Sequence, residues 1–327
     1  MLRAVLEAGA DLVRLNGAHG TPVTHARAAE LARAIAGDLG RELTVLVDLP
    51  GPKLRIGKVP DDEIELATAA RFSLTSAGTQ PSEPGVTTNV PDIGALVDVG
   101  DEVWLADGEI LLEVMAVDRD GAVTEIVRGG VLRSGKGLAV PGAEGVLDPF
   151  TEADAEILDL ALRLDAEMVG VSFVRTPDDV GRVRALVHGT PNPPMVVAKI
   201  ETRQAVDGIE AIVATADAVM VARGDLGVQI GVIRTPLVQK EVIRLCNERG
   251  RPVIIATQML ESMTRSPLPT RAEASDVVNA VLDGSDALML SEETGVGSYP
   301  SAAVATMAEL VLAAESWQPP NSPDTDT

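Results

Sequence analysis

The stretch Met195-Val-Val-Ala-Lys-Ile-Glu201 decides how this chain folds. Its first four residues are apolar at odd and even positions alike, which is typical of a strand buried on both faces of a parallel sheet. Lys199 and Glu201 then end the run, and they project to the same side because side chains two apart share a strand face. The stretch therefore predicts a buried parallel strand with a charged end.

Similar apolar runs recur along most of the chain, at residues 12–15, 44–48, 168–172, 218–222, 253–256 and 287–290. Signals for helix ends separate these runs. A threonine followed by proline, or by an acid three residues later, marks the start of a helix, and a glycine marks its end. The starts are Thr151, Thr176, Thr235 and Thr270, and the stops are Gly189, Gly250 and Gly284. This alternation predicts a parallel sheet. Seven units favour a β/α barrel over a six-stranded open sheet, and no Gly-x-Gly-x-x-Gly turn follows an early strand.

Residues 57–145 interrupt this pattern with Val-rich alternation and Asp-Gly and Gly-Gly turns, and they contain no long helical segment. We interpret them as a small β domain inserted after the second apolar run. The expected organisation is a barrel formed by residues 1–56 and 146–317, the insertion 57–145, and a disordered tail 318–327. The tail is rich in Pro, Asp, Ser and Thr, which disfavour a packed core.

The composition excludes several classes of protein. Net charge is −22, which argues against a general nucleic-acid binder or a protein of anionic membranes. The single cysteine, Cys246, allows neither an intrachain disulfide nor a Cys-based zinc site. No run of 18 apolar residues and no signal segment is present. We therefore expect a soluble, reduced, cytoplasmic protein.

Charged and polar residues follow the apolar runs, at the strand ends where β/α barrels place their chemistry. They are Arg14, Asn16, Asp48, Lys199, Glu201, Asp225, Thr257, Ser291 and Glu293. Two carboxylates on neighbouring strands, Glu201 and Asp225, suit a hard divalent cation that keeps several waters. Lys199 beside them suits an anionic, oxygen-rich substrate such as a phosphate. The alternative is a set of solvated charges at the starts of loops.

Several motifs now carry a family resemblance. The Lys199-Ile-Glu201 run resembles the active-site signature of pyruvate kinases, and residues 220–228 resemble that family's metal-binding strand. Residues 256–263, 269–273 and 276–284 are almost identical to the corresponding family motifs. Residues 14–20 and 51–55 resemble the family's nucleotide and monovalent-cation segment. The resemblance covers about residues 1–312 and rests on motifs in the family's order.

The resemblance implies a β/α (TIM-type) barrel with a small β-barrel lid inserted after the third strand. The chain starts in what resembles the first barrel helix and stops after the last one. We therefore expect the family's first strand and its C-terminal regulatory domain to be absent. A start assigned too far downstream would explain the missing strand.

The resemblance also implies phosphoryl transfer from phosphoenolpyruvate to ADP, giving pyruvate and ATP in glycolysis (EC 2.7.1.40). Lys199 would lie against the transferring phosphoryl group and Arg14 would contact the phosphate. Glu201 and Asp225 would hold Mg²⁺ or Mn²⁺. Backbone N–H groups around Gly224, together with Thr257, would bind the substrate, and Ser291 and Glu293 would lie where enolpyruvate is protonated. The nucleotide would face Asn16, His19, Arg55 and Lys136.

The monovalent-cation segment departs from the family pattern. Asn16 and Asp48 are retained, but Ala18 stands where a Ser usually offers an oxygen, and Lys53 stands where an acid is common. An ammonium is a compact positive charge with three donors, so Lys53 beside Asp48 could replace K⁺. We therefore expect K⁺ not to be required, and family members with Lys at this position are K⁺-independent. The alternative is that Lys53 points to solvent.

Other functions stay open at this point. A metal-dependent aldolase or lyase of the phosphoenolpyruvate/pyruvate barrel group also uses Glu and Asp from adjacent strands. An inactive truncated paralogue is favoured by the missing strand and by Glu292, which stands where the family has Gly. We expect no nucleic-acid or membrane partner, and a homo-oligomer formed through barrel surfaces.

Overall fold

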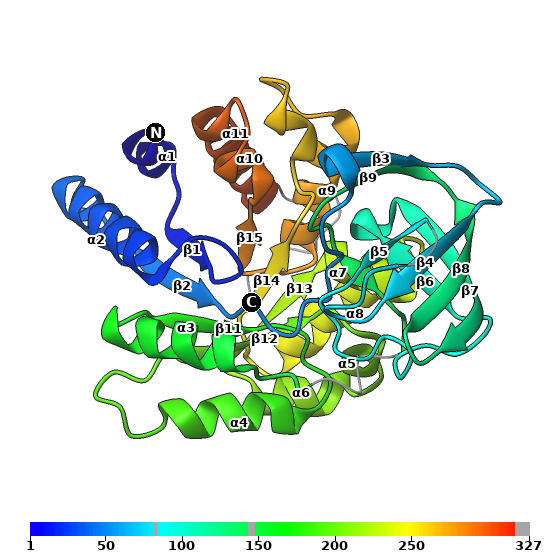
Figure 1. Ribbon diagram of the computed structural model, residues 1–327. Helices are drawn as coiled ribbons and strands as arrows, with labels where there is room; N and C mark the ends of the chain where they lie inside the picture. The colour runs from blue at the N-terminus through cyan, green and yellow to red at the C-terminus, as the bar shows by residue number, and fades with distance from the viewer. Residues whose placement is uncertain (82–83, 143–147, 318–327) are drawn as a thin grey trace.

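A sheet of seven parallel strands forms the larger part of the computed structural model, which describes residues 1–81, 84–142 and 148–317 (Figure 1). The order in the sheet is β1-β2-β11-β12-β13-β14-β15, which follows the chain. All seven apolar runs are strands, as predicted. Their bounds are β1 (Leu12–Asn16), β2 (Thr44–Asp48), β11 (Met168–Val171), β12 (Met195–Ile200), β13 (Ala218–Ala222), β14 (Val253–Ala256) and β15 (Ala287–Met289).

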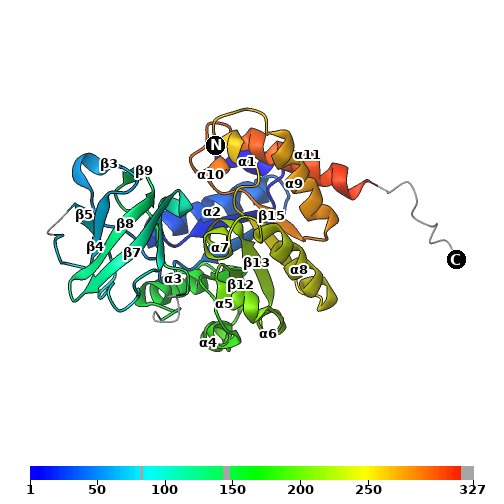
Figure 2. The same cartoon turned by 90° about the vertical axis from the view of Figure 1, so that its right-hand side faces the viewer.

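Helices connect these strands and surround the sheet (Figures 1 and 2). They are α1 (Leu2–Glu7), α2 (Pro22–Asp38), α3 (Glu152–Arg163), α4 (Pro177–Val187), α5 (Arg203–Asp207), α6 (Ile209–Thr215), α7 (Arg223–Ile230), α8 (Thr235–Glu248), α9 (Arg271–Leu282), α10 (Glu292–Gly295) and α11 (Pro300–Glu315). Thr151, Thr176 and Thr270 are the N-caps of α3, α4 and α9, as predicted, and each forms a capping box with the acid three residues later. The predicted start of α8 is shifted by one residue, because Arg234 is its N-cap and Thr235 its first residue.

Strand parity divides the buried residues between two faces of the sheet. Val196, Ala198 and Ile200 pack in the main core together with residues of the surrounding helices. Val197 belongs to a smaller cluster with interior residues of the other strands. Lys199 shares the parity of Val197, so its side chain projects to the inner face.

The sheet is an incomplete β/α barrel. β1 and β15 stand at its two ends, and within the described part of the chain no strand pairs with the outer edge of either. The remaining neighbours are joined by parallel pairing in regular register, for example Lys199 with Met220 between β12 and β13. The carboxyl ends of all seven strands therefore meet at one end of the fold.

The segment between β2 and α3 forms a β lid with a hydrophobic core of its own. Its strands are β3 (Glu63–Leu66), β4 (Arg71–Thr75), β5 (Gly85–Thr87), β6 (Glu102–Leu105), β7 (Ile110–Asp118), β8 (Gly121–Arg128), β9 (Gly130–Arg133) and β10 (Leu138–Ala139). Six of them form a sheet in the order β10-β6-β7-β8-β4-β5, and β3 and β9 form a two-stranded ribbon. Figure 2 shows the lid standing beside the barrel.

The chain crosses between barrel and lid twice, and Asp154 ties the two crossings together. Its carboxylate accepts hydrogen bonds from the backbone N–H of Gly51 on the outgoing segment (2.8 Å) and of Thr151 on the returning one (2.7 Å). Arg182 of α4 adds an ion pair to Asp148 (2.6 Å) and stacks over Phe150. Both crossings are therefore fastened to the barrel.

The tail expected at residues 318–327 and part of the expected return to the barrel near residue 145 lie outside the described residues. Across the residues that are described, no helix is long and apolar enough to cross a membrane.

Candidate active site

A buried ammonium forms the centre of the site. Lys199 extends from the inner face of β12 and is 6% exposed. Its Nζ lies 2.6 Å from Ser172 Oγ, 3.0 Å from Glu201 Oε1 and 3.1 Å from both carboxylate oxygens of Asp48. Burial alone would lower the pKa of this ammonium, but the carboxylates of Asp48 and Glu201 outweigh it and hold the pKa above its ordinary value. Lys199 is therefore a fixed positive charge.

Asp48, at the end of β2, pairs with two cationic side chains. Besides Lys199, it accepts hydrogen bonds from Nε of Arg14 (2.7 Å) and from Nη2 of the same guanidinium. Its side chain is buried, and a Cβ added to Gly170 on the neighbouring strand would lie 2.8 Å from its Oδ1. Only a glycine at that position leaves room for this carboxylate.

Glu201 is fully enclosed and fixed in orientation. Its Oε2 accepts a hydrogen bond from the backbone N–H of Phe173 (2.7 Å), which has a left-handed backbone at φ 54°. Burial raises the pKa of the Glu201 carboxyl, and the nearby carboxylates of Asp225 and Asp48 add to this, whereas the Lys199 ammonium and the Phe173 N–H oppose it. A second positive charge near Glu201 would therefore stabilise its ionised form.

Lys53 makes an ion pair that differs from the expected one. We expected its ammonium beside Asp48, but it lies 3.3 Å from Oδ1 of Asp225 at the start of α7. The position beside Asp48 is filled by Arg14 and Lys199. Because those two cations already neutralise Asp48, Lys53 instead places its charge on one of the two carboxylates expected to hold a metal. The pair also shows that Lys53 does not simply point to solvent.

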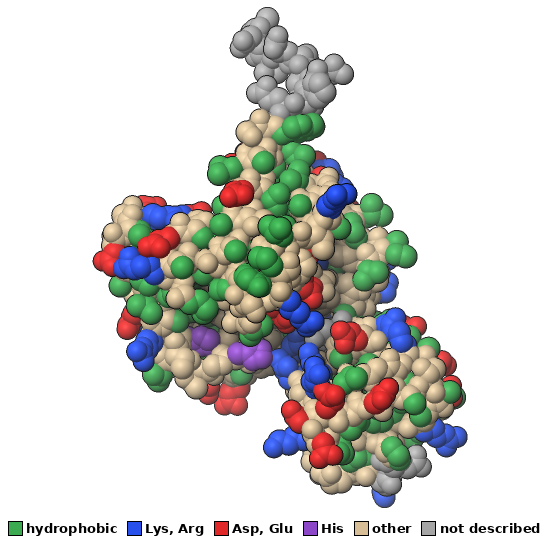
Figure 3. Space-filling view, turned by 90° about the horizontal axis from the view of Figure 1, so that it is seen from above, with side chains coloured by type: hydrophobic (Ala, Val, Ile, Leu, Met, Phe, Trp, Pro, Cys, Tyr) green, Lys and Arg blue, Asp and Glu red, His purple; other side chains and the backbone are tan. Residues whose placement is uncertain are grey.

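These side chains line a polar cavity of about 380 Å³. Arg14, Asn16, His19, Asp48, Lys53, Arg55, Ser172, Lys199, Glu201 and Asp225 are among its lining residues. Nine of these ten were proposed as site residues from the sequence, and the structure brings them together around one space. Figure 3 shows Lys and Arg side chains gathered where the two lobes of the molecule meet. The lining includes four Lys or Arg and three Asp or Glu side chains, so the cavity holds charges of both signs in a chain whose net charge is −22.

Thr257 and Gly224 lie next to each other at the ends of β14 and β13. The N–H of Gly224 donates a hydrogen bond to Thr257 Oγ1 (2.8 Å), which in turn donates to the carbonyl of Ala256 (2.6 Å). The binding of a substrate carboxylate by backbone N–H groups around Gly224 stays a prediction, and in this structure the Gly224 N–H is bonded to Thr257. Neither residue is among those that line the polar cavity.

Ser291 and Glu293 form a separate group after β15. Glu293 is 2% exposed and accepts hydrogen bonds from the N–H groups of Leu260 (3.1 Å) and Ser291 (2.8 Å). Within the described residues Ser291 Oγ is buried and has no hydrogen-bond partner. Glu292 is exposed at the start of α10. Glu293 therefore connects the loops after β14 and β15, and these residues too lie outside the lining of the polar cavity.

Lys136 lies in the lid loop between β9 and β10 and is exposed. It lines neither of the two cavities described here. Its loop nevertheless meets the polar cavity, because Nη1 of Arg55 donates to the carbonyl of Gly135 (3.0 Å) and the N–H of Ile56 donates to the carbonyl of Lys136 (3.0 Å).

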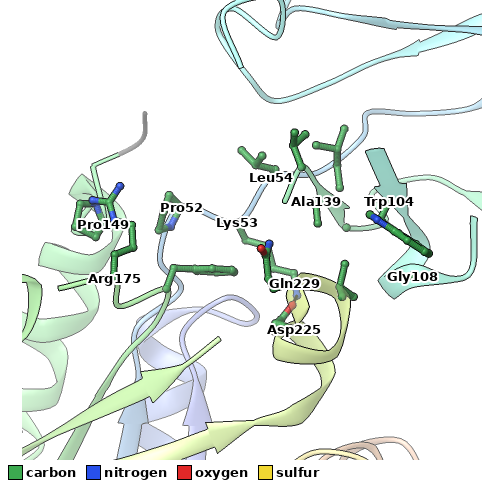
Figure 4. A pocket seen from close by; sticks show the side chains of 15 residues that line it. Pro52, Lys53, Leu54, Trp104, Gly108, Ala139, Pro149, Arg175, Asp225 and Gln229 are labelled. Carbon is green, nitrogen blue, oxygen red and sulfur yellow. Dashed lines mark hydrogen bonds and ion pairs between the residues drawn. The ribbon is translucent and has the colours of Figure 1, made fainter. Parts of the chain in front are cut away.

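A second, mainly apolar cleft of about 730 Å³ opens between lid and barrel (Figure 4). Trp104 and Ala139 of the lid, Phe173 and Val228 of the barrel, and Lys53 between them are among its lining residues. Trp104 is half-buried and lines this cleft, and the Arg128 guanidinium lies over its ring at 5.1 Å from the centroid. Lys53, Phe173 and Asp225 line both spaces and form the wall between them.

The carboxylate pair Glu201 and Asp225 fits a hard divalent cation. Both line the polar cavity, and they are close enough that Asp225 raises the pKa of Glu201. The described side chains contain no group of three or more His, Cys, Asp or Glu that could hold a metal. A cation here would therefore complete its shell with water and with substrate oxygens, as Mg²⁺ commonly does.

Comparison with known proteins agrees with this site. Residues 1–304 match the family model described as "Pyruvate kinase, barrel domain". The chain is 44% identical to the pyruvate kinase of Mycobacterium tuberculosis over 315 residues, which is 96% of this chain and 67% of the relative. It is 38% identical to that of Thermococcus litoralis, with 97% and 67% of the two chains covered, and 41% identical to that of Geobacillus stearothermophilus, with 95% and 54% covered. The chain therefore belongs to the pyruvate kinase family of phosphotransferases.

Proposed function

We propose that this chain transfers the phosphoryl group of phosphoenolpyruvate to ADP and that the transfer takes place in the polar cavity. The observation that carries the proposal is the Lys199 ammonium, buried among Asp48, Glu201 and Ser172 and facing a space shared with Arg14 and Asp225. Such transfer depends mainly on positioning and on charge stabilisation. A cation that is held in place before reaction needs no reorganisation when charge develops.

Each residue has a distinct role in this proposal. Lys199 offsets the charge on the transferring phosphoryl group, and Arg14 holds its oxygens from the end of β1. Asp48 orients both cations, because it contacts each of them. Glu201 and Asp225 hold the divalent cation, which when bound neutralises substrate oxygens. The family generally uses Mg²⁺.

The nucleotide is proposed to bind on the lid side of the same cavity. Asn16, His19 and Arg55 line the cavity, and Lys136 lies in the lid loop that Arg55 contacts. Thr257 contacts the substrate from β14, and Ser291 and Glu293 act on the side where enolpyruvate takes up a proton. Ser291 Oγ, buried and without a partner among the described residues, is available to a water on that side.

We also propose that K⁺ is not required. The side chain of Ala18 offers no oxygen ligand, and Asp48, the acid of the cation segment, is already paired with Arg14 and Lys199. Lys53 supplies a further fixed charge beside Asp225. The expected result is full activity in buffer free of K⁺, with Lys53→Glu less active and partly restored by added K⁺. A wild-type protein that is inactive until K⁺ is added would refute this part of the proposal.

A coupled assay tests the main proposal. Pyruvate should form from phosphoenolpyruvate only when ADP and Mg²⁺ are both present, and it can be followed through NADH oxidation by added lactate dehydrogenase. Cleavage of 4-hydroxy-2-oxo acids without pyruvate formation from phosphoenolpyruvate would identify an aldolase instead. Absence of both activities, with Glu292→Gly restoring the first, would place the defect at the exposed acid beside Ser291.

A further inference from the structure

The loop that follows β14 begins with two residues in an uncommon backbone conformation. Thr257 has φ 71° and Gln258 has φ 54°, both in the left-handed region. Residues other than glycine seldom adopt it, and a β-branched residue such as Thr does so only when its surroundings impose it. The strain lies at the carboxyl end of a barrel strand, where catalytic groups are placed. Something in the structure must therefore hold Thr257 in this conformation.

Arg223 supplies that restraint from the end of β13. Its Nη2 donates to the carbonyls of Thr257 (2.8 Å) and Gln258 (3.1 Å), and its Nε donates to the Thr257 carbonyl (3.2 Å). The guanidinium is a rigid, planar fork, so its bonds fix both carbonyls relative to each other. Its side chain is only 11% exposed, which shields these bonds from water.

Asp276 of α9 holds the guanidinium in turn. Its Oδ2 lies 2.6 Å from Nη1 of Arg223, on the side of the fork that faces away from Thr257. The Oε1 of Gln239 on α8 lies 3.3 Å from the same nitrogen. The chain of contacts therefore runs from α9 through Arg223 to the strained backbone, and charge-assisted bonds of this kind are the stronger ones.

The consequence appears at the Thr257 hydroxyl. In its left-handed conformation Thr257 places Oγ1 2.8 Å from the N–H of Gly224, which directly precedes Asp225. A relaxed backbone with negative φ would turn the side chain away and break this contact. The conformation of Thr257 thus sets the position of the first turn of α7, which carries one of the two proposed metal carboxylates.

We propose that Asp276 and Arg223 are positioning residues for Thr257 and, through it, for Gly224 and Asp225. The proposal rests on the proposed function and goes beyond it, because neither residue lines the polar cavity. Asp276→Asn keeps the size of the side chain and removes its charge, so that the guanidinium is free to move. Arg223→Lys keeps the charge but cannot bond to two carbonyls and a carboxylate in one plane.

The experiment measures steady-state kinetics, melting temperature and hydrogen exchange on the same samples. For Asp276→Asn we expect kcat to fall roughly ten- to hundredfold, since misplacement of about 1 Å has this effect. KM for ADP should stay within about twofold, because the residues proposed to bind ADP lie outside the chain of contacts that joins Asp276, Arg223 and Thr257. Amides of residues 257–264 should exchange faster while β14 and α9 stay protected. Asp276→Glu should restore part of kcat.

Asp283→Asn is the matched control. Asp283 is the C-cap of α9, and its substitution likewise removes a carboxylate that makes an ion pair, here with Lys240 (2.5 Å) and away from Arg223. We expect wild-type kcat and loop exchange for this variant. Asp276→Asn with wild-type kcat, or with a loss matched by Asp283→Asn or explained by a lower melting temperature, would overturn the proposal. If the wild type forms no pyruvate, the proposed function fails. The exchange rates of residues 257–264 in Asp276→Asn then decide by themselves whether Asp276 and Arg223 hold the loop after β14.

Discussion

At the scale of single residues, Lys199 illustrates how a barrel interior uses a charge. The ammonium is buried but has Asp48, Glu201 and Ser172 within hydrogen-bond distance, so that its desolvation is compensated. Among the residues that the structure describes, the one other lysine that lines the polar cavity is Lys53, which is paired with Asp225. These two residues therefore carry separable roles that single substitutions can test.

Lys199→Met should abolish phosphoryl transfer. The substitution removes the positive charge that the substrate would meet, and the loss of one preorganised electrostatic group costs on the order of 10²-fold or more in rate. The measurement is kcat in the coupled assay, with the melting temperature as a check of folding. Lys240→Met, which removes an exposed lysine on α8, is the control and should retain full activity. A Lys199→Met protein within twofold of wild type would exclude Lys199 from the mechanism.

Lys53→Met should tighten divalent-cation binding in the absence of substrates. The Lys53 ammonium competes for Asp225 Oδ1 at 3.3 Å, so its removal frees that oxygen. A partly exposed pair contributes up to about 1 kcal/mol, which corresponds to about a fivefold change in affinity. Titration with Mn²⁺ followed by electron paramagnetic resonance measures it.

Two comparisons make the Lys53 prediction specific. Lys58→Met removes an exposed lysine from the same segment and should leave Mn²⁺ affinity unchanged. In an Asp225→Asn background, Lys53→Met should have no further effect, because the partner carboxylate is gone. Equal Mn²⁺ affinity in Lys53→Met and wild type would show that the ion pair does not influence the metal site.

At the scale of elements, α9 stabilises the loop after β14 through two side chains of its first turns. Glu273 accepts hydrogen bonds from the N–H (2.7 Å) and hydroxyl (2.5 Å) of Ser262 and from the N–H (2.7 Å) and hydroxyl (2.8 Å) of Thr270. One carboxylate thus caps its own helix and holds the 3₁₀ turn Glu261–Thr264. Asp276, one turn further, acts through Arg223.

This arrangement predicts a pH-dependent stability. Partial burial raises the pKa of Glu273, but the four hydrogen bonds outweigh it and hold the pKa below its ordinary value of 4.5. A lowered pKa in the folded state means that the stabilisation is complete above pH 4.5 and is lost as pH falls through the folded-state value. Glu273→Gln should therefore lower stability by about 1 kcal/mol at pH 7, the difference between charge-assisted and neutral bonds, and progressively less in acid.

Glu261 provides a control of opposite sign for this prediction. Burial and the carboxylates of Glu292, Glu293 and Glu273 raise its pKa, so that its ionised form is disfavoured in the folded state. Its contribution to stability is present at low pH and lost as pH rises, so Glu261→Gln should cause no loss at pH 7. Melting temperatures between pH 3 and pH 8 measure both variants. A pH-independent deficit in Glu273→Gln would contradict the charge-assisted cap.

At the scale of the whole molecule, lid and barrel are two bodies with separate hydrophobic cores joined by two crossings. The cleft between them, about 730 Å³, is walled by Trp104 from the lid and by Phe173 and Val228 from the barrel. A ligand that contacts both bodies should draw them together, because it buries surface on each side. The position of Trp104 makes such a movement observable.

Ligand binding should change the fluorescence of Trp104. The chain has two tryptophans, and Trp317 is exposed at the end of the barrel, so Trp317→Phe leaves Trp104 as the single reporter. Addition of Mg²⁺, phosphoenolpyruvate and ADP together should shift its emission to shorter wavelength as the cleft loses water. Trp104→Phe should give no such shift with the same ligands. An unchanged emission of Trp104 in a protein that turns over would show that the lid does not close on this side.

The sequence by itself determined the strands, the capped helices and most of the polar cavity. These features are local: a strand buried on both faces needs apolar residues at both parities, and a capping box needs its two residues three positions apart. Strand parity then placed Lys199 and Glu201 on one face, and the shared carboxyl ends of parallel strands brought Arg14, Asp48 and Asp225 to them. His19, Lys53 and Arg55 came instead from the resemblance to pyruvate kinases, because no local pattern marks them as site residues.

Only the tertiary structure decided which of these groups are partners. Lys53 pairs with Asp225, 172 positions away, and not with Asp48, five positions away, because Arg14 and Lys199 already fill the space around Asp48. Trp104 lines the cleft because the lid packs beside the barrel there. The Thr257 carbonyl is held by Arg223, and Arg223 is held by Asp276 from α9. No local sequence pattern encodes which charged groups pair, which side chains line the cleft or which residues have a strained backbone. These features depend on distances between segments that are far apart in the chain.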